Sequence, residues 1–331
     1  MLDNPLISII LLCYNQENFV EEAIEGIFLQ TYLPLEIVIV DDCSTDNTAD
    51  IIEACIARQR CGLAVRFVRN TKNFGSWASA KLGLNMTQAR FVIIASGDDI
   101  MLPELVAEIV TVWMTDNVSL VTANASYIDE RSNSLNRTFR DPNIPADDTF
   151  ETLARDGSNA CCFGPAIGFE RAIYTTFGWP PAYLNAYDIM LPFYAYLLKG
   201  ARFISKPLLK YRVHGQNSSL SLRAEKANAL ERVLIEERMY LDHLAHGTLM
   251  EEVLVRLCDE APQQYSAIAG RILPLLTIQL SEMAKKLVRV SRQSGTLAQS
   301  TMDVPISGAQ ASIYHDGQQR GSRQQIDPTG F

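Results

Sequence analysis

The sequence has few of the features that mark zinc proteins, secreted proteins or membrane-spanning proteins. Its seven cysteines include no Cys-x-x-Cys pair and its four histidines are scattered, so the spacing of zinc ligands is absent. The apolar stretch at residues 7–12 is too short for a signal-peptide core or a membrane span, and longer apolar stretches are interrupted by charges. We therefore expect reduced cysteines that serve as small apolar residues, and a cytoplasmic protein.

Positive charge is also scarce. The 331 residues include 29 Lys and Arg residues against 38 Asp and Glu residues, which gives a formal net charge of −9. A nucleic-acid backbone requires a basic protein surface, so we expect no nucleic-acid partner. With 47% hydrophobic residues, the chain is long enough for one large α/β domain with additional elements.

Two apolar runs, each followed by a pair of aspartates, are the most informative feature of the chain. Residues 35–40 (LEIVIV) lead into Asp41 and Asp42, and residues 91–95 (FVIIA) lead into Ser-Gly-Asp-Asp at 96–99. Short β-branched runs bounded by turn residues are typical of buried strands in a parallel sheet. Ligands of such sheets bind beyond the carboxyl ends of the strands, so these four carboxylates predict a site for a divalent metal and a sugar-bearing ligand.

Strands and helices alternate in the first 123 residues, which is the pattern of an α/β sheet with helices on its faces. The expected strands are 6–13, 35–40, 64–68, 91–95 and 119–123. Between 127 and 148 the pattern weakens and predicts a long loop, typical of a mobile or substrate-covering element. The further expected elements are strands at 161–169, 201–204 and 208–213 and a helix at 186–199.

The composition changes after residue 217. The predicted helices of this part are 222–245, 250–258 and 268–290. Residues 301–331 are polar and rich in Gln, Ser and Gly, and we expect them to be largely disordered. The expected division is a catalytic domain at 1–219, a helical extension at 220–295 and a disordered tail at 296–331.

Several motifs occur in an order and at spacings that resemble one enzyme family. They are SIILLCYN at 8–15, QTY at 30–32, VDDCSTD at 40–46, NFG at 73–75, GDD at 97–99 with LP at 102–103, and YRVH at 211–214. Together they resemble a family 2 glycosyltransferase of the GT-A fold, over about residues 5–219. The resemblance implies an α/β, Rossmann-like mixed sheet with flanking helices. It also implies metal-dependent transfer of a sugar, with inversion, from a nucleotide sugar to an acceptor hydroxyl.

In that family a carboxylate at the position of Asp42 recognises the nucleotide base. A carboxylate can accept a hydrogen bond from the imide N–H of uracil or thymine, which favours a UDP- or dTDP-sugar donor. The other residues that the resemblance assigns to nucleotide-sugar binding are Tyr14, Asn15, Asp41, Lys72 and Asn73. The alternative for Asp41 and Asp42 is that they only cap the turn at Ser44, and for the others it is ordinary turn or surface chemistry.

The second acidic pair matches the family's motif for the divalent ion and the ribose. Asp99 is the expected metal ligand, and Asp98 is expected to contact the ribose or to support the metal. The family usually has Asp-x-Asp here, so Ser96 leaves one carboxylate missing. The resemblance implies His214 as a second ligand for Mg²⁺ or Mn²⁺ or as a diphosphate contact, and Arg212 as a phosphate contact. For both residues a structural role is the alternative.

An inverting transfer also needs a carboxylate that takes the proton of the acceptor hydroxyl. The resemblance assigns this role to Asp188, in the sequence AYDIML at 186–191, where Tyr187 replaces a first acid that the family carries. The alternative for Asp188 is an acid that stabilises a helix N-terminus. Asp147 and Asp148 form another acidic pair, which we interpret as solvated loop residues.

These expectations describe a glycosyltransferase that builds a surface polysaccharide, a lipid-linked oligosaccharide or a glycoprotein glycan. The expected acceptor is a saccharide, a lipid-linked saccharide or a protein. One rival is a nucleotidyltransferase, but residues 13–18 lack the Gly-rich basic phosphate loop of that class. The other rival is a degenerate transferase that binds a nucleotide sugar or a partner enzyme without turnover. The departures at Ser96 and Tyr187 keep this second rival open.

The C-terminal helices indicate two further contacts. The helix at 222–245 is one along which the chain can pair with a second copy of itself. A basic cluster set among apolar residues permits a surface helix that touches anionic lipid at the inner face of the membrane, with a packing helix and a solvated face as the alternative. This cluster comprises Lys285, Lys286, Arg289 and Arg292, and Arg271 lies among the same apolar residues.

Overall fold

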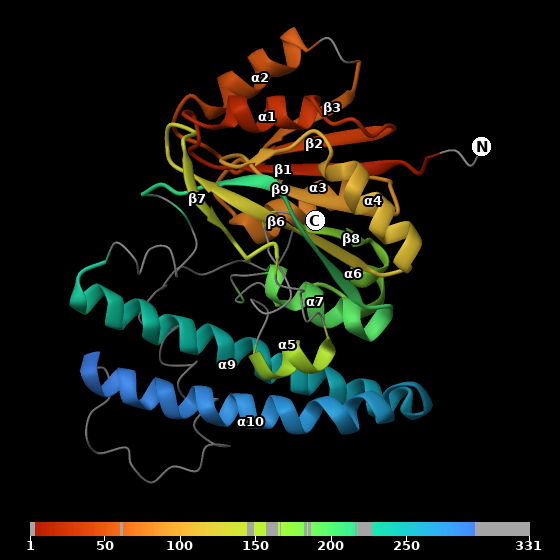
Figure 1. Cartoon of the computed structure of the whole chain (residues 1–331), viewed down its shortest axis with the longest axis vertical. Coiled ribbons are helices and arrows are strands. Elements are labelled where there is room, and N and C mark those ends of the chain that lie inside the picture. The colour runs from red at the N-terminus through yellow and green to blue at the C-terminus, as the bar shows by residue number, and fades with distance from the viewer. Residues whose placement is uncertain are drawn as a thin grey trace.

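A computed structural model describes the chain at residues 4–59, 62–143, 149–156, 165, 167–181, 184, 187–215, 217 and 227–294. A mixed β-sheet forms the centre of the molecule, helices cover both of its faces, and two long helices lie side by side beyond one face (Figure 1). This arrangement confirms the predicted α/β class and the predicted C-terminal helices.

The strands of the sheet are β1 (Ile7–Cys13), β2 (Leu35–Asp41), β3 (Ala64–Arg69), β4 (Phe91–Ser96), β5 (Ile100–Met101), β6 (Leu120–Ile128), β7 (Ser134–Thr138), β8 (Ile167–Glu170) and β9 (Ala201–Arg212). Their order is β3-β2-β1-β4-β8-β6-β9-β5, and β7 pairs with β6. Strands β1 to β4 are parallel, and β6 and β9 run in the same direction, whereas β5, β7 and β8 are antiparallel to their neighbours. The carboxyl ends of β1, β2, β4, β6 and β9 therefore meet at one edge.

Two predictions in the second half of the sheet were wrong. Part of the loop expected at 127–148 is the end of β6 together with β7, which form an antiparallel pair. The two strands expected at 201–204 and 208–213 are the single strand β9. Strand β9 continues because its pairing with β6 shifts register where Asn124 faces Pro207, and a proline, which lacks an N–H, is tolerated at such a bulge. The strand expected at 161–169 begins at Ile167, and residues 157–164 and 166 lie outside the described part.

The helices divide between the two faces of the sheet. One face is covered by α1 (Val20–Phe28), α2 (Thr48–Arg58) and α4 (Leu105–Asp116). The other is covered by α3 (Ser76–Asn85), α5 (Phe150–Asp156), α6 (Ala172–Phe177) and α7 (Tyr187–Leu198). Helix α7 was predicted, whereas the short helices α5 and α6 were not.

Alternation along β2 shows why these strands are apolar throughout. Ile37 and Ile39 pack into the core on the side of α1 and α2, and Val38 and Val40 pack on the side of α3. All four side chains are fully buried, because both faces of the sheet are covered. The same alternation directs Asp41 and Asp42 to opposite sides of the sheet.

The chain ends in two antiparallel helices, α9 (Ala229–Glu260) and α10 (Pro262–Ser294), which lie below the sheet in Figure 1. Helix α9 begins with a capping box between Asn228 and Glu231 and joins the two helices predicted at 222–245 and 250–258. Leu254 and Ile272 belong to the same core cluster as α5 and α7, so this pair packs directly onto the sheet domain. Within the described residues, no helix has the length and apolar character that crossing a membrane requires.

Candidate functional site

The two acidic pairs flank the end of β1. The Asp42 N–H donates to the Cys13 carbonyl oxygen at 2.8 Å, and on the other side the Gly97 N–H donates to the Leu12 carbonyl oxygen at 2.9 Å. Since neighbouring strands lie about 4.8 Å apart, the two pairs start about 10 Å from each other. The prediction that they share one edge of the sheet is therefore confirmed in the fold.

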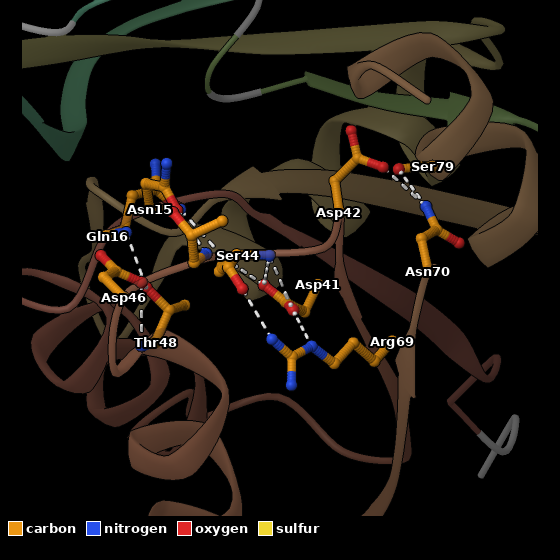
Figure 2. A network of polar contacts seen from close by, with 11 residues as sticks. Asn15, Gln16, Asp41, Asp42, Ser44, Asp46, Thr48, Arg69, Asn70 and Ser79 are labelled. Carbon is orange, nitrogen blue, oxygen red and sulfur yellow. Dashed lines mark hydrogen bonds and ion pairs between the residues drawn. The ribbon is translucent and has the colours of Figure 1, made fainter. Parts of the chain in front are cut away.

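Asp41 and Asp42 point in opposite directions, as Figure 2 shows. The Asp41 side chain is fully buried and accepts hydrogen bonds from the Ser44 hydroxyl and N–H, and its Oδ2 lies 3.1 Å from Arg69 Nε. Asp41 therefore closes the turn after β2. This geometry favours the turn-capping alternative for Asp41, and its assignment to the nucleotide stays a prediction.

The turn after β1 is tied to the turn after β2 by side-chain contacts. The Asn15 N–H donates to Ser44 Oγ at 2.9 Å, and Asn15 Oδ1 accepts from the Thr45 N–H at 2.8 Å. Asn15 has a φ of +52°, a conformation that asparagine tolerates better than most residues. The Gln16 N–H donates to Thr48 Oγ1 at 2.7 Å. Asn15 thus holds the two turns together. The neighbouring Tyr14 is exposed.

Asp42 organises the loop at 70–75. Its Oδ1 accepts from Asn70 Nδ2 at 2.7 Å and from the Phe74 N–H at 2.9 Å, and its Oδ2 accepts from the Gly75 N–H at 2.7 Å. An ionised carboxylate has about four acceptor positions, so one position on Oδ2 remains for a ligand donor. Asp42 is thereby suited both to fix this loop and to accept one further N–H.

Lys72 and Asn73 lie on that loop and are exposed. Lys72 Nζ is 5.0 Å from the centre of the Phe74 ring, and Asn73 Oδ1 accepts from the Gly75 N–H at 3.0 Å. Gly75, with a φ of +87°, lets the chain turn into α3 without strain. Lys72 and Asn73 therefore lie on the exposed loop that Asp42 fixes. Their contact with a nucleotide stays a prediction.

Asp98 and His214 meet in the second part of the site. Asp98 Oδ2 lies 2.9 Å from His214 Nε2, and both side chains are largely buried. The His214 ring is 4.9 Å from the Phe19 ring, and the His214 N–H donates to Asn217 Oδ1 at 2.6 Å. Residues that are 116 positions apart in the sequence thus form one carboxylate–imidazole pair.

Asp99 carries an unsatisfied oxygen. The residue is 3% exposed, and its Oδ1 accepts from the Arg212 N–H at 2.9 Å. Its Oδ2 is buried and accepts no hydrogen bond from any residue that the structure describes. Burial, and after it the charge of Asp98, raises the pKa of Asp99 well above its ordinary value of 3.8. A buried carboxylate oxygen without a donor is a position where a cation would be stabilised.

Gly97 brings this acidic segment close to β1. A Cβ atom at this position would collide with Gln16 Oε1 and would lie 2.9 Å from Cys13 Sγ. Any other residue here would require the Gln16 and Cys13 side chains to shift, so glycine at the second position of Ser-Gly-Asp-Asp permits this close approach.

The donor set fits part of a coordination shell for Mg²⁺ or Mn²⁺. Carboxylate oxygens and an imidazole suit these ions, and Mg²⁺ is usually held by one or two carboxylates together with phosphates and water. Among the described residues no three His, Cys, Asp or Glu side chains enclose an ion by themselves. Asp98, Asp99 and His214 would therefore share the ion with a diphosphate and water.

Arg212 is occupied by protein contacts. Its side chain is 1% exposed, and its Nε donates to the Asp98 carbonyl oxygen at 2.9 Å. The two terminal nitrogens donate to Ser132 Oγ at 2.9 Å and to Glu22 Oε2 at 2.8 Å. The arrangement favours the structural alternative, because the guanidinium has no open face for a phosphate. A phosphate contact by Arg212 stays a prediction that this geometry does not support.

Asp188 stands in the first turn of α7, and its side chain lies outside the described part, as do Asp147 and Asp148. Trp77 Nε1, at the start of α3, donates to the Pro181 carbonyl oxygen at 3.3 Å, and Asp188 follows Pro181 by seven residues. The role of Asp188 as the base stays a prediction.

Sequence reasoning missed Phe19 and Glu22. Both lie at the start of α1, and they contact His214 and Arg212 from the far end of the chain. The only available signal was the position of α1, directly after the turn that follows β1. The sequence placed Glu22 on a polar helix face, where such residues are usually solvated.

Comparison with known proteins agrees with this geometry. The model of the family described as glycosyl transferase family 2 matches residues 8–177, slightly more than half of the chain. The chain belongs to this family. The family and the GT-A fold that the motifs predicted are confirmed.

Its relatives are moderately similar. The uncharacterized glycosyltransferase alr2836 of Nostoc is 26% identical over 219 residues, which cover 65% of this chain and 67% of that protein. An uncharacterized glycosyltransferase of Haemophilus influenzae is 32% identical, but the match covers only 38% of this chain and 37% of that protein. WfgD of Escherichia coli, named a UDP-Glc:alpha-D-GlcNAc-diphosphoundecaprenol beta-1,3-glucosyltransferase, is 24% identical over 57% of this chain and 70% of its own length.

Two solved structures share the fold. Residues 1–349 of S. aureus TarS in complex with UDP-GlcNAc superpose with a TM-score of 0.55 at 15% identity, covering 87% of this chain and 92% of that one. The mannosyltransferase PcManGT from Pyrobaculum calidifontis, in complex with GDP-Man and Mn²⁺, gives a TM-score of 0.53 at 18% identity, covering 88% of each chain. At these identities the likeness concerns the fold.

Proposed function

We propose that this glycosyltransferase moves a sugar from a nucleoside-diphosphate sugar to an acceptor hydroxyl with inversion at the anomeric carbon. The observation that carries the proposal is the gathering of Asp42, Asp98 and Asp99 at one edge of the sheet, with a buried oxygen of Asp99 left without a donor. The related structures with UDP-GlcNAc and with GDP-Man and Mn²⁺ support this class of donor.

Asp42 is the residue that would read the base. The remaining acceptor position on its Oδ2 can take the imide N–H of uracil or thymine, which favours a UDP- or dTDP-sugar. Tyr14, directly after β1, supplies an exposed ring, and Lys72 and Asn73 supply polar atoms on the loop that Asp42 holds. Asn15 and Asp41 contribute by keeping the turns after β1 and β2 in place.

Asp98, Asp99 and His214 are the residues that would hold Mg²⁺ or Mn²⁺. When bound, such an ion neutralises charge on the departing nucleoside diphosphate. To hold the ion, Asp98 and His214 would give up their direct 2.9 Å contact, and Asp99 would have to be ionised. The three side chains that would bind the ion thus lie close together and are largely buried.

Asp188 is the residue that would remove the proton from the acceptor hydroxyl. The acceptor oxygen then bonds to the anomeric carbon as the bond from that carbon to the diphosphate oxygen breaks. The proton stays on Asp188, and the bonding electrons leave with the nucleoside diphosphate. A single displacement of this kind inverts the anomeric configuration.

The test is donor turnover with and without EDTA. A panel of UDP- and dTDP-sugars is incubated with Mn²⁺ and a mixture of saccharide acceptors, and release of the nucleoside diphosphate is measured. We expect turnover that EDTA abolishes and that Asp99→Asn removes. Asp116→Asn, which alters an exposed carboxylate paired with Arg202, is the matched control and should keep full activity.

Binding without turnover would instead favour the degenerate transferase. A thermal-shift screen of nucleoside diphosphates with Mn²⁺ separates the cases, because a ligand raises the melting temperature only if it binds the folded state. A rise for UDP or dTDP combined with no turnover on any acceptor would overturn the catalytic proposal. No rise for any nucleotide would overturn the donor class as well.

The acceptor and the setting remain predictions. The name of the E. coli relative supports a lipid-linked acceptor and surface polysaccharide assembly, with a saccharide or protein acceptor as the alternatives. Lys285, Lys286, Arg289 and Arg292 are all exposed near the end of α10, which is consistent with peripheral contact with anionic lipid. Pairing of two copies through α9, and a cytoplasmic location at the inner face of the membrane, likewise stay predictions.

A further inference from the structure

Arg212 is one of the largest fully buried side chains of the described residues, although it carries a full charge. A buried charge is costly unless it is paired and hydrogen-bonded. Among the described residues, the groups that accept from its guanidinium come from three separate segments around the acidic edge, at Asp98, at 129–132 and at Glu22.

We propose that Arg212, fixed by Glu22, is a positioning residue for the cation site formed by Asp98, Asp99 and His214. This inference rests on the proposed function, since it concerns the same site. It adds the pair Arg212 and Glu22, which contacts neither the nucleotide sugar nor the acceptor and acts by positioning the metal ligands.

The first step is that Arg212 holds the acidic segment at two points. Its Nε donates to the Asp98 carbonyl oxygen, and its own N–H donates to Asp99 Oδ1, both at 2.9 Å. One residue thereby sets the backbone at 98 and the side-chain rotamer at 99. Because Oδ1 of Asp99 is occupied, Oδ2 is the oxygen left for a cation.

The second step is that His214 is placed by the same strand end. Asn217 Nδ2 donates to the Arg212 carbonyl oxygen at 2.9 Å, and Asn217 Oδ1 accepts from the His214 N–H at 2.6 Å. Asn217 therefore links Arg212 to His214, which fixes the backbone of His214 relative to Arg212. Arg212 thus contacts or is linked to all three proposed metal ligands, Asp98, Asp99 and His214.

The third step is that the guanidinium itself is held. Glu22 Oε2 accepts from Arg212 at 2.8 Å and from Ser132 Oγ at 2.6 Å, and the Phe19 ring centre lies 4.9 Å from the guanidinium carbon. Burial acts to raise the pKa of Glu22, but the hydrogen bonds from Ser132 and Arg212 outweigh it and lower the pKa. Glu22 is thus kept ionised as the partner of Arg212.

The planar fork of arginine suits this task. Its donors are directed to the Asp98 carbonyl, to the turn after β6 through Asp129 and Ser132, and to Glu22. Lysine would supply three donors from one point and could not reach these acceptors together. Arg212→Lys should therefore restore charge without restoring position.

The first experiment measures Mn²⁺ binding by isothermal titration calorimetry, with the full chain and with saturating UDP. Removing residues that orient metal ligands typically weakens metal binding by about 10- to 100-fold, and we expect this loss in Arg212→Met. We expect Arg212→Lys to recover little of it. The matched control is Arg171→Met, because Arg171 also donates to two carbonyls and a hydroxyl but lies at the opposite edge of the sheet. This control should lose stability and keep the wild-type dissociation constant for Mn²⁺.

A second pair of variants covers the case in which Arg212→Met does not fold. Glu22 is half-exposed on α1, so Glu22→Ala should fold, and we expect it to weaken Mn²⁺ binding by about 3- to 10-fold, less than loss of the arginine itself. Glu21→Ala is the matched control, since Glu21 is the preceding residue of α1 and pairs with Arg58 away from the site.

The outcomes separate this inference from the proposed function. If the wild-type chain does not bind Mn²⁺ with or without UDP, the proposed function is overturned and the inference with it. If the wild type binds Mn²⁺ and the Glu22 and Arg212 variants bind equally well, only the inference is overturned. Equal weakening in the variants and in their matched controls would also overturn it, because the effect would then be one of stability.

Discussion

Glu36 and Glu170 at the amino edge of the sheet and Asp99 at its carboxyl edge hold their carboxylates in opposite ways, whereas Asp41, also at the carboxyl edge, is held as the two glutamates are. At the amino edge, Glu36 accepts hydrogen bonds from Ser8 Oγ and from the N–H groups of Gln88 and Ala89. At that edge Glu170 accepts from Arg90, Lys199 and Trp113. At the carboxyl edge, Asp99 keeps an oxygen with no donor among the described residues.

The pKa shifts of these three carboxyl groups differ in direction in the same way. Burial acts to raise the pKa of both Glu36 and Glu170, but hydrogen bonds outweigh it, so both values are lowered. For Asp99 burial and the charge of Asp98 prevail, and the pKa is raised. The two glutamates serve stability, as Asp41 does, whereas Asp99 keeps the capacity to bind a positive ligand.

The largest expected effect is on turnover at the carboxyl edge. Asp98→Asn removes a charge from the pair with His214 and should lower kcat by about 100- to 1000-fold, the usual cost of losing one electrostatic contact to the transition state. The measurement is nucleoside diphosphate release under saturating donor and Mn²⁺, with circular dichroism to show that the fold is retained. Glu36→Gln, at the amino edge, should keep kcat within about twofold of the wild type in its folded fraction. Loss of kcat in both variants would remove the functional distinction between the edges.

The next effect concerns stability and falls on the amino edge. Glu170→Gln leaves Arg90 and Lys199 without their carboxylate partner, and breaking a buried ion pair costs about 3 kcal/mol, reduced here because both cations are partly exposed. Asp99→Asn should be neutral or stabilising in metal-free buffer, because it replaces a buried carboxyl group that lacks a full set of partners. Urea unfolding at pH 7 with EDTA measures both. A cost for Asp99→Asn equal to that of Glu170→Gln would contradict the comparison.

Much of the carboxyl edge could be predicted from the sequence, because β-branched runs followed by acidic pairs locate strand ends without any long-range information. The opposite directions of Asp41 and Asp42 also follow from the two-residue period of a strand, a signal that was present in the sequence. The contacts of Arg212 could not be predicted, since its partner Glu22 is 190 positions away and only the folded chain brings them together. For the same reason Glu22 resembled an ordinary solvated helix residue.

A smaller effect sharpens the comparison within the carboxyl edge. Asp42→Asn keeps an acceptor but loses the charge that receives three N–H donors, so we expect UDP or dTDP to bind about tenfold more weakly in the presence of Mn²⁺. Asp41→Asn should lower the melting temperature by disturbing the turn at Ser44, with less than threefold effect on nucleotide affinity. Calorimetric titration of the nucleotide measures both. The reverse order of affinities would assign the nucleotide contact to Asp41.

The smallest effect is a difference in pH dependence between the two edges. Glu170 has a lowered pKa, so its contribution to stability is present above the unfolded value, near 4.5, and is lost as the pH falls through the folded pKa. The gap in unfolding free energy between the wild type and Glu170→Gln should therefore shrink as the pH falls from 6 to 3.

Asp99 has a raised pKa, so its ionisation destabilises the metal-free fold increasingly as the pH rises above the unfolded value. The unfolding free energy of Asp99→Asn relative to the wild type should grow from pH 4 to pH 7. The growth is at most about 1.4 kcal/mol for each unit by which folding raises the pKa of Asp99. Urea unfolding at each pH with EDTA gives the unfolding free energy of the wild type minus that of each variant. This difference should rise with pH for Glu170→Gln and fall with pH for Asp99→Asn, and a change in the same direction for both would show that Glu170 and Asp99 are not held differently.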